Sequence, residues 1–126
     1  MKKKVLSLLL VLAMMFSLCI TVGAEEPAED LSGSIIILHT NDVHGAIDGY
    51  AKAAALKKTY EDMGAYVLLM DAGDFIQGDP AVSTSEGATA VELMNLAGYD
   101  VAAPGNHEFD YGYANLKELA GKADFP

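Results

Sequence analysis

The chain has 126 residues, of which 8 are lysine, none is arginine and 18 are acidic, so its formal net charge is −10. A surface this acidic repels the phosphates of DNA, RNA and anionic lipids, which argues against a polymeric nucleic acid as partner. A substrate that carries phosphate would need a cation to offset the same repulsion.

The first 24 residues have the three parts of a secretory signal peptide. Three lysines follow Met1, residues 5–22 are apolar, and Gly23 and Ala24 are small residues of the kind that a signal peptidase reads. We therefore expect cleavage after Ala24 and a secreted protein, extracellular, in the cell wall or periplasmic, which meets the membrane only through its export signal. The alternative is an uncleaved anchor, because about 18 apolar residues can just span a bilayer.

Cleavage would change the composition of the chain. Cys19 is the only cysteine, so the mature protein would have no disulfide and no thiol chemistry. A lipid on Cys19 is less favoured, because the bulky Leu18 precedes it. With three lysines removed, 5 basic residues face 18 acidic ones, a net charge of −13. About a hundred residues would remain, which suffices for one small core.

Residues 25–34 ("EEPAEDLSGS") are polar and acidic, and they predict a disordered lead to the domain. From residue 35 onward the pattern repeats three times as an apolar run, a polar loop with glycine and a helical segment. Each helical segment is followed by a glycine, Gly64, Gly98 or Gly121, that can end it. The predicted pairs of strand and helix are Ile35–Thr40 with Tyr50–Met63, Tyr66–Met70 with Glu86–Ala97, and the weaker Tyr99–Ala103 with Tyr113–Ala120.

This alternation predicts an α/β fold in which the strands are parallel and joined by right-handed crossovers (βαβαβα). The first run is continuous and β-branched, as expected of a strand that is buried on both faces. All three polar loops follow the carboxyl ends of strands, where ligands bind in such sheets, so they can converge on one site. A further strand is expected where the sequence stops, and we interpret residues 35–126 as the amino-terminal part of a longer domain.

The first loop, "NDVHGAIDG", contains Asp42 and His44. In an extended segment residues two apart point the same way, so this carboxylate and imidazole can bind one cation. The alternative is an aspartate that makes a turn beside an exposed histidine.

The second loop, "DAGDFIQGDP", contains Asp71, Asp74 and Asp79. Carboxylates this close repel one another unless they are protonated or bind metal. A carboxylate can also bridge two cations, which lie about 3.5–4 Å apart in two-metal sites. On its own, however, the loop is more typical of an Asp/Gly turn than of a metal site.

The third loop, "APGNHEFDYG", places Asn106, whose amide oxygen is a neutral ligand, beside His107. Asp110 lies three residues further on, where its carboxylate can fix the tautomer of the imidazole and raise its basicity. Glu108 either supports a neighbouring ligand or stabilises a helix amino terminus. Taken alone, this loop too can be an ordinary turn.

Together, "ILHTNDVHG", "DAGDFIQGD" and "GNHEFDYG", in this order and each after a strand, resemble the calcineurin-like metallophosphoesterases. Within them the resemblance is to the secreted 5'-nucleotidase family, which includes UDP-sugar hydrolases and 2',3'-cyclic-nucleotide phosphodiesterases. It covers residues 35–126 and implies the first part of a metallophosphoesterase α/β sandwich, incomplete at the carboxyl terminus. The implied function is metal-dependent hydrolysis of nucleotide phosphoesters in nucleotide catabolism.

The resemblance also implies a role for individual residues. It implies two divalent cations: Asp42 and His44 are ligands of the first, Asn106 is a ligand of the second, and the carboxylate of Asp74 bridges the two. His107 and Asp110 are the implied dyad that stabilises the transition state and protonates the leaving group. Asp71 and Asp79 match no ligand position and are expected to be loop structure. For His39, on the first strand, we expect a place in the core or in support of the site.

The family's other metal ligands and its nucleoside-binding carboxy-terminal domain have no counterpart in these 126 residues, so we expect the chain alone to have little or no activity. Aspartate, histidine and asparagine suit manganese, zinc, magnesium or iron. One alternative is a non-catalytic secreted domain of the same fold that binds metal or another ligand. A dinucleotide-binding domain ranks last, because no G-x-G-x-x-G follows the first strand.

Overall fold

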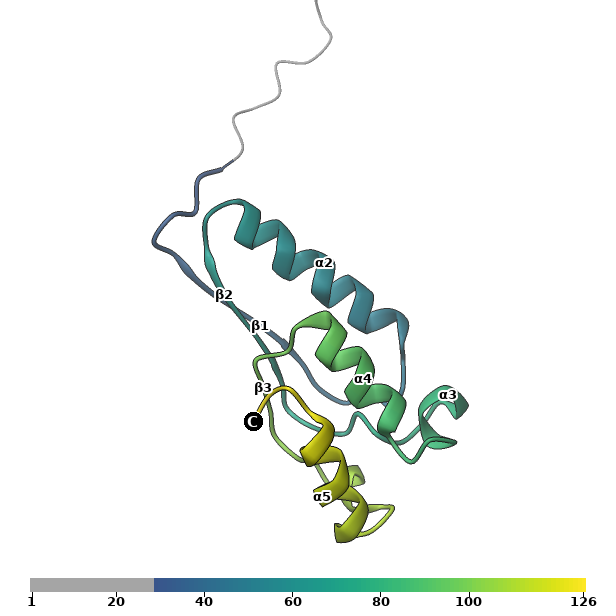
Figure 1. Cartoon of the computed structure of the whole chain (residues 1–126). Helices are drawn as coiled ribbons and strands as arrows, with labels where there is room; N and C mark the ends of the chain where they lie inside the picture. The colour runs from purple at the N-terminus through teal and green to yellow at the C-terminus, as the bar shows by residue number, and fades with distance from the viewer. Residues whose placement is uncertain (1–28) are drawn as a thin grey trace, which may run out of the picture.

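The computed structural model describes residues 29–126, so the predicted signal peptide and residues 25–28 of the acidic lead lie outside the described residues. Strands and helices alternate as predicted (Figure 1). The elements are β1 (Ile35–Thr40), α2 (Asp48–Asp62), β2 (Tyr66–Asp71), α3 (Pro80–Ser83), α4 (Ala88–Ala97), β3 (Val101–Ala102), the 3-10 helix η2 (His107–Phe109) and α5 (Tyr113–Lys122). Among residues 29–126, no helix has the length and apolar character needed to cross a bilayer.

The three strands form one parallel sheet in the order β1-β2-β3, which confirms the predicted α/β fold. β1 and β2 pair along their whole length, from Ile35 opposite Tyr66 to Thr40 opposite Asp71. β3 pairs with β2 only through Val101 and Ala102. The sheet is therefore most regular where β1 and β2 lead into the first two polar loops.

The helices α2, α4 and α5 lie in one layer over one face of the sheet (Figure 1). Successive right-handed crossovers that run in the same direction place their helices on the same face. α4 lies in the middle of the layer and turns its apolar stripe inward, with Ala90, Val91, Met94 and Ala97 buried. The core thus lies between the helices and one face of the sheet.

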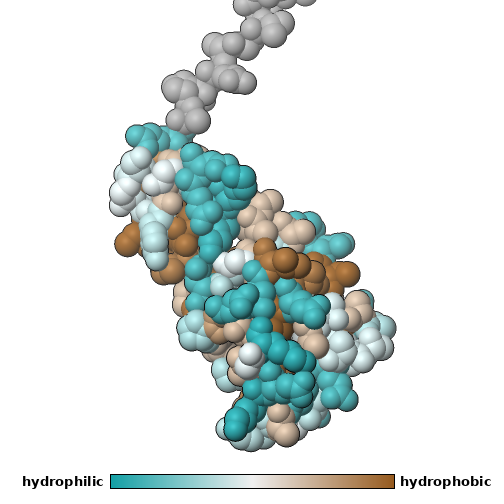
Figure 2. Space-filling model, in the orientation of Figure 1, coloured by the Kyte–Doolittle hydropathy of each residue, from teal (hydrophilic) through white to brown (hydrophobic). Residues whose placement is uncertain are grey.

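The other face of the sheet is uncovered in the described part of the chain. Ile35 and Ile37 are 70% and 60% exposed, so the prediction that β1 is buried on both faces is wrong for these residues. His39, which we expected in the core or in support of the site, lies on the same face of β1 and is exposed. The reason is that α2, α4 and α5 pack on the opposite face. Figure 2 shows a hydrophobic patch beside the strands and another between α2 and α4.

Several boundaries differ from the prediction. α2 begins two residues earlier than predicted, and α4 begins two residues later. α5 continues through Gly121, which was predicted to end it. The short α3 was not predicted; Asp79 caps it by accepting a hydrogen bond from the N–H of Ala81 (2.8 Å). β3 is shorter than the predicted run because Tyr99 is buried in the core and the carboxylate of Asp100 accepts hydrogen bonds from Lys57 and the N–H of Leu69.

The end of the acidic lead is ordered by hydrogen bonds. The N–H of Leu31 donates to the carbonyl of Met63 (2.8 Å), and the N–H of Ser34 donates to the carbonyl of Leu31 (2.9 Å). The carbonyl of Ser34 in turn accepts from the N–H of Tyr66 (2.9 Å). The prediction of disorder is therefore wrong for residues 31–34, which join β1 to the end of α2.

Candidate metal centre

The first two polar loops are joined by backbone hydrogen bonds that continue the pairing of β1 with β2. The N–H of Asp42 donates to the carbonyl of Gly73 and that of His44 to the carbonyl of Asp74, both at 3.0 Å. The carbonyl of His44 then accepts from the N–H of Asp79 at 2.9 Å. The position of the first loop is thus set by the second, as the predicted convergence of the loops requires.

The second and third loops touch through two glycines. A Cβ atom on Gly73, whose φ is +106°, would overlap the backbone of Gly105. A Cβ atom on Gly105 would overlap the carboxylate of Asp74. Only glycine at both positions lets the two loops approach this closely.

His44, Asp74 and His107 come from the three loops, one from each, and form a group that could hold a metal ion. One ligand atom from each lies within 4.8 Å of the others. The rings of His44 and His107 meet edge to face with their centres 5.0 Å apart. Two imidazoles and a carboxylate are ligands that suit zinc, manganese or iron, so the residues fit a divalent cation.

The other predicted site residues lie beside this group. Asp42 is exposed, with Oδ1 3.8 Å from Nε2 of His44 and Oδ2 accepting a hydrogen bond from Asn41 (2.7 Å). Asn106 is exposed and immediately precedes η2. The roles that the resemblance implies for Asp42, Asn106 and the rest of the site therefore stay predictions, although the three loops that carry these residues meet at one edge of the sheet.

Three of the candidate ligands have a left-handed backbone. Among the described residues other than glycine only four have positive φ, and they include Asp42 (52°), His44 (46°) and Asp74 (64°). This conformation costs an ordinary residue about 1–2 kcal/mol, and less for aspartate or histidine. Local strain of this kind persists where surrounding bonds enforce it, and it is concentrated at functional sites.

His107 is held by Asp110 as predicted. Its Nδ1 lies 2.7 Å from Oδ2 of Asp110, across one turn of η2. This hydrogen bond is the main cause that raises the pKa of His107; slight burial opposes it, and the charges of Asp110, Asp74 and Glu108 add to it. Nε2 is the ring nitrogen that Asp110 leaves free.

Glu108 is fully buried and accepts hydrogen bonds from four backbone N–H groups. Three come from the second loop, at Asp74 (2.7 Å), Phe75 (2.8 Å) and Ile76 (3.3 Å), and the fourth comes from Gly105. Of the two roles predicted for Glu108, the contacts favour support of a neighbouring ligand, since only Gly105 belongs to the turn that precedes η2.

Asp71, expected to be loop structure, is the last residue of β2 and is buried beneath the site. It accepts hydrogen bonds from the hydroxyl of Thr40 and the N–H of Gly73, and the hydroxyls of Thr40 and Tyr99 lie 2.8 Å apart. Burial is the main cause that raises the pKa of Asp71. Sequence reasoning missed this network. The only signal for it was that Thr40 and Asp71 both end strands that pair in register.

Comparison with known proteins agrees with this arrangement. The sequence model of the calcineurin-like phosphoesterase family matches residues 35–124. A snake venom 5'-nucleotidase of Gloydius brevicauda is 38% identical over 136 residues, which cover 94% of this chain and 22% of that protein. A 5'-nucleotidase of Bos taurus is 34% identical over 110 residues, which cover 73% of this chain and 19% of the bovine protein.

A solved structure shares the fold. The crystal structure of a Staphylococcus aureus protein described as a 5'-nucleotidase, in complex with alpha-ketoglutarate, superposes with a TM-score of 0.59 at 24% identity. The match covers 72% of this chain and 22% of that one. The chain thus spans about a fifth of the length of these relatives.

Proposed function

Because the chain belongs to the calcineurin-like phosphoesterase family, we propose that the complete protein hydrolyses nucleotide phosphoesters, as its 5'-nucleotidase relatives are named for doing. The single observation that carries the proposal is that side-chain atoms of His44, Asp74 and His107 lie within 4.8 Å of one another, so that the proposed acid stands beside two proposed metal ligands. An acidic protein needs such a centre, since its own charge repels a phosphorylated substrate.

In this proposal Asp42, His44, Asp74 and Asn106 would together hold two divalent cations, with Asp42 and His44 as ligands of one, Asn106 as a ligand of the other and Asp74 as a ligand of both. Manganese, zinc, magnesium and iron all suit this set of ligands. A divalent cation supplies a Lewis acid for the phosphoryl oxygens and lowers the pKa of an attacking water.

His107 is the proposed acid that protonates the leaving group. Asp110 occupies Nδ1, so Nε2 is the atom that presents the proton. Since the hydrogen bond with Asp110 raises the pKa of His107, the imidazolium persists to a higher pH than in a free histidine. It can then both donate the proton and offset negative charge in the transition state.

The activity is proposed for the complete protein. Four ligand side chains shared between two cations leave each cation with too few ligands. We expect residues 25–126 alone to release little or no phosphate from AMP with manganese or zinc. Turnover by this chain at rates typical of enzymes would contradict that expectation.

The decisive experiment measures phosphate release from AMP by the complete gene product, with each of the four metals added to metal-free protein. We expect Asp74→Ala and His107→Ala each to lower kcat by about a hundredfold or more, as loss of transition-state stabilisation does. Asp62→Ala is the matched control, because that carboxylate is exposed and its ion-pair partner among residues 29–126 is Lys58. If both site variants turn over as fast as the control, the assigned site is wrong.

The rival is a secreted domain that binds metal or another ligand without catalysis. If this rival is right and the ligand is a metal, the unmutated complete protein binds manganese yet releases no phosphate from any nucleotide. A full coding sequence with histidines after further buried strands would favour the enzyme, and one without them would favour the rival.

We also propose export to the cell surface or beyond, on the pattern of residues 1–24. Amino-terminal sequencing of the protein recovered from its native cells should begin at Glu25. A first residue at or near Met1 in a membrane fraction would instead indicate an uncleaved anchor.

A further inference from the structure

Glu108 is a buried carboxylate that has no part in the proposed chemistry. Its side chain is 0% exposed, and within residues 29–126 all its hydrogen bonds come from backbone N–H groups. Burying a carboxylate is unfavourable unless its acceptor positions are used. Here each oxygen accepts two bonds, so that cost is offset by a set of four donors.

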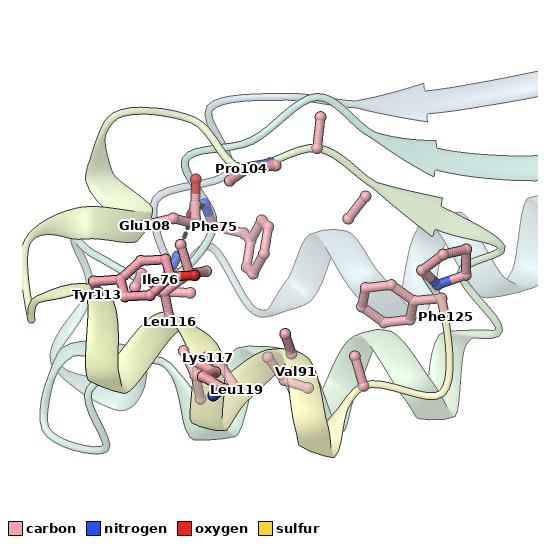
Figure 3. Close-up of a pocket in the computed structure, with 15 residues that line it drawn as sticks. Phe75, Ile76, Val91, Pro104, Glu108, Tyr113, Leu116, Lys117, Leu119 and Phe125 are labelled. Atoms are coloured by element: carbon pink, nitrogen blue, oxygen red, sulfur yellow. Dashed lines mark hydrogen bonds between the residues drawn. The ribbon is translucent and has the colours of Figure 1, made fainter.

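The donors join two loops. Oε1 accepts from Phe75 and Ile76, and Oε2 accepts from Asp74 and Gly105. We call Glu108 with these four N–H groups the Glu108 clamp. Figure 3 shows the side chain reaching across to Phe75 and Ile76, at the wall of a mainly apolar cavity of about 370 Å³.

A second bond runs in the opposite direction between the same loops. The N–H of His107 donates to Oδ1 of Asp74 at 2.8 Å, while the N–H of Asp74 donates to Glu108. Both the backbone and one carboxylate oxygen of Asp74 are thereby tied to the turn that carries His107. The left-handed φ of 64° at Asp74 is held by the same bonds.

We propose that Glu108 is a positioning residue: its clamp sets the placement of the Asp74 carboxylate relative to His107 and thereby the affinity of the centre for metal. This inference rests on the proposed function, since it takes Asp74 to be a ligand. Glu108 itself touches neither substrate nor metal in this account; it acts through Asp74 and His107.

The substitution that tests the clamp is Glu108→Gln, which keeps the shape of the side chain. One oxygen then becomes an NH2 group that faces two N–H donors, so two hydrogen bonds are lost and their donors stay buried without a partner. We expect amide hydrogen exchange to accelerate at least tenfold in the metal-free protein at the pair of residues that faces the new NH2 group, either Asp74 and Gly105 or Phe75 and Ile76. We also expect Mn²⁺ affinity to fall at least tenfold.

The measurements use the complete gene product, stripped of metal and titrated with Mn²⁺ while free Mn²⁺ is followed by electron paramagnetic resonance. Excess Mn²⁺ should restore part of the lost kcat, and KM for AMP should change little, because substrate contacts are untouched. Glu118→Gln is the control: this glutamate is exposed, pairs with Lys122 and should leave both readouts unchanged.

A folded Glu108→Gln protein with wild-type Mn²⁺ affinity would overturn the proposal. If that variant does not fold, Glu108→Asp replaces it, because the shorter side chain keeps the charge but cannot reach all four donors. We then expect Mn²⁺ to bind at least threefold more weakly than to the wild type. Wild-type Mn²⁺ affinity in Glu108→Asp would contradict the proposal. Failure of both variants to fold would assign Glu108 to stability alone. A wild-type protein that binds no Mn²⁺ and releases no phosphate would instead defeat the proposed function, while the exchange rates of the metal-free protein would still report on the clamp.

Discussion

At the carboxyl ends of the strands, backbone contacts backbone: Gly73 lies against Gly105, and four N–H groups converge on the buried Glu108. On the face of the sheet away from the helices, Ile35, Ile37 and Tyr66 are exposed. The loops of the candidate site are thus organised by bonds among themselves. The sheet face, by contrast, depends on whatever covers it, since an extended apolar surface of this kind is typical of a contact surface.

The largest effect on stability should come from adding a side chain where Gly73 contacts Gly105. We expect Gly73→Ala to lower the free energy of unfolding of the mature chain by about 3–5 kcal/mol, because left-handed strain adds to overlap with the backbone of Gly105. Gly98→Ala is the matched control: its φ is also positive, at +75°, but the added Cβ would meet only the flexible end of Lys57, at an ordinary contact distance of 3.7 Å. The control should cost only about 1 kcal/mol in urea denaturation. Equal costs would mean that the loops are not held in close contact.

The same residue type allows the buried core to be compared with the open face of the sheet. Ile76 is 0% exposed in the core, and Ile37 is 60% exposed on the open face. We expect Ile76→Ala to cost about 3 kcal/mol and Ile37→Ala less than about 1 kcal/mol, measured by urea denaturation of the mature chain. If Ile37→Ala proves as costly as Ile76→Ala, the open face is covered in solution and the contrast disappears.

Asp79 should matter to stability and not to chemistry. Asp79→Ala removes the cap of α3, so we expect a loss of about 1 kcal/mol. Phosphate release by the complete protein should stay within a factor of two or three of wild type. A hundredfold loss of turnover would instead make Asp79 part of the site.

The smallest effect concerns the charge of His107. In metal-free protein we expect Asp110→Asn to lower the pKa of His107 toward its ordinary value of 6.5, measured by NMR titration of the ring, because the main cause of its elevation is removed. A raised histidine pKa stabilises the fold below the unfolded-state value, and this contribution is lost as pH rises through the folded-state value. As the pH rises from the unfolded-state pKa of His107 to its higher folded-state pKa, the wild type should therefore lose slightly more stability than the variant.

Asp62→Asn serves as the control for this titration, since that carboxylate pairs with Lys58 at the end of α2. It should leave the His107 titration unchanged. An unchanged titration in Asp110→Asn as well would show that Asp110 does not hold the imidazole.

The local features of the fold were readable from the sequence because they follow from short-range pattern. The apolar run at Ile35–Thr40 and the glycine Gly98 at the end of α4 correspond directly to structure. The convergence of the three loops also followed, since parallel strands place their carboxyl ends at one edge. His44, Asp74 and His107, one from each loop, do lie together, although the sequence assigned His107 to the catalytic dyad and not to the metal ligands.

What the sequence could not reveal depends on tertiary contacts. The exposure of His39 and the brevity of β3 depend on which neighbours each strand has, and no local pattern encodes that. The burial of Glu108 depends on N–H groups more than thirty residues earlier in the chain. In sequence, an acid after a histidine resembles any solvated turn.

The order of the strands, β1-β2-β3, repeats the order of the chain. A polypeptide delivered from its amino terminus, by the ribosome or through a translocation channel, can therefore add each strand to an edge that already exists. Among the three strands of residues 29–126, none has to be inserted between two earlier ones, and no early pairing has to be undone. The three loops of the candidate centre would then come together one after another, in the order of synthesis.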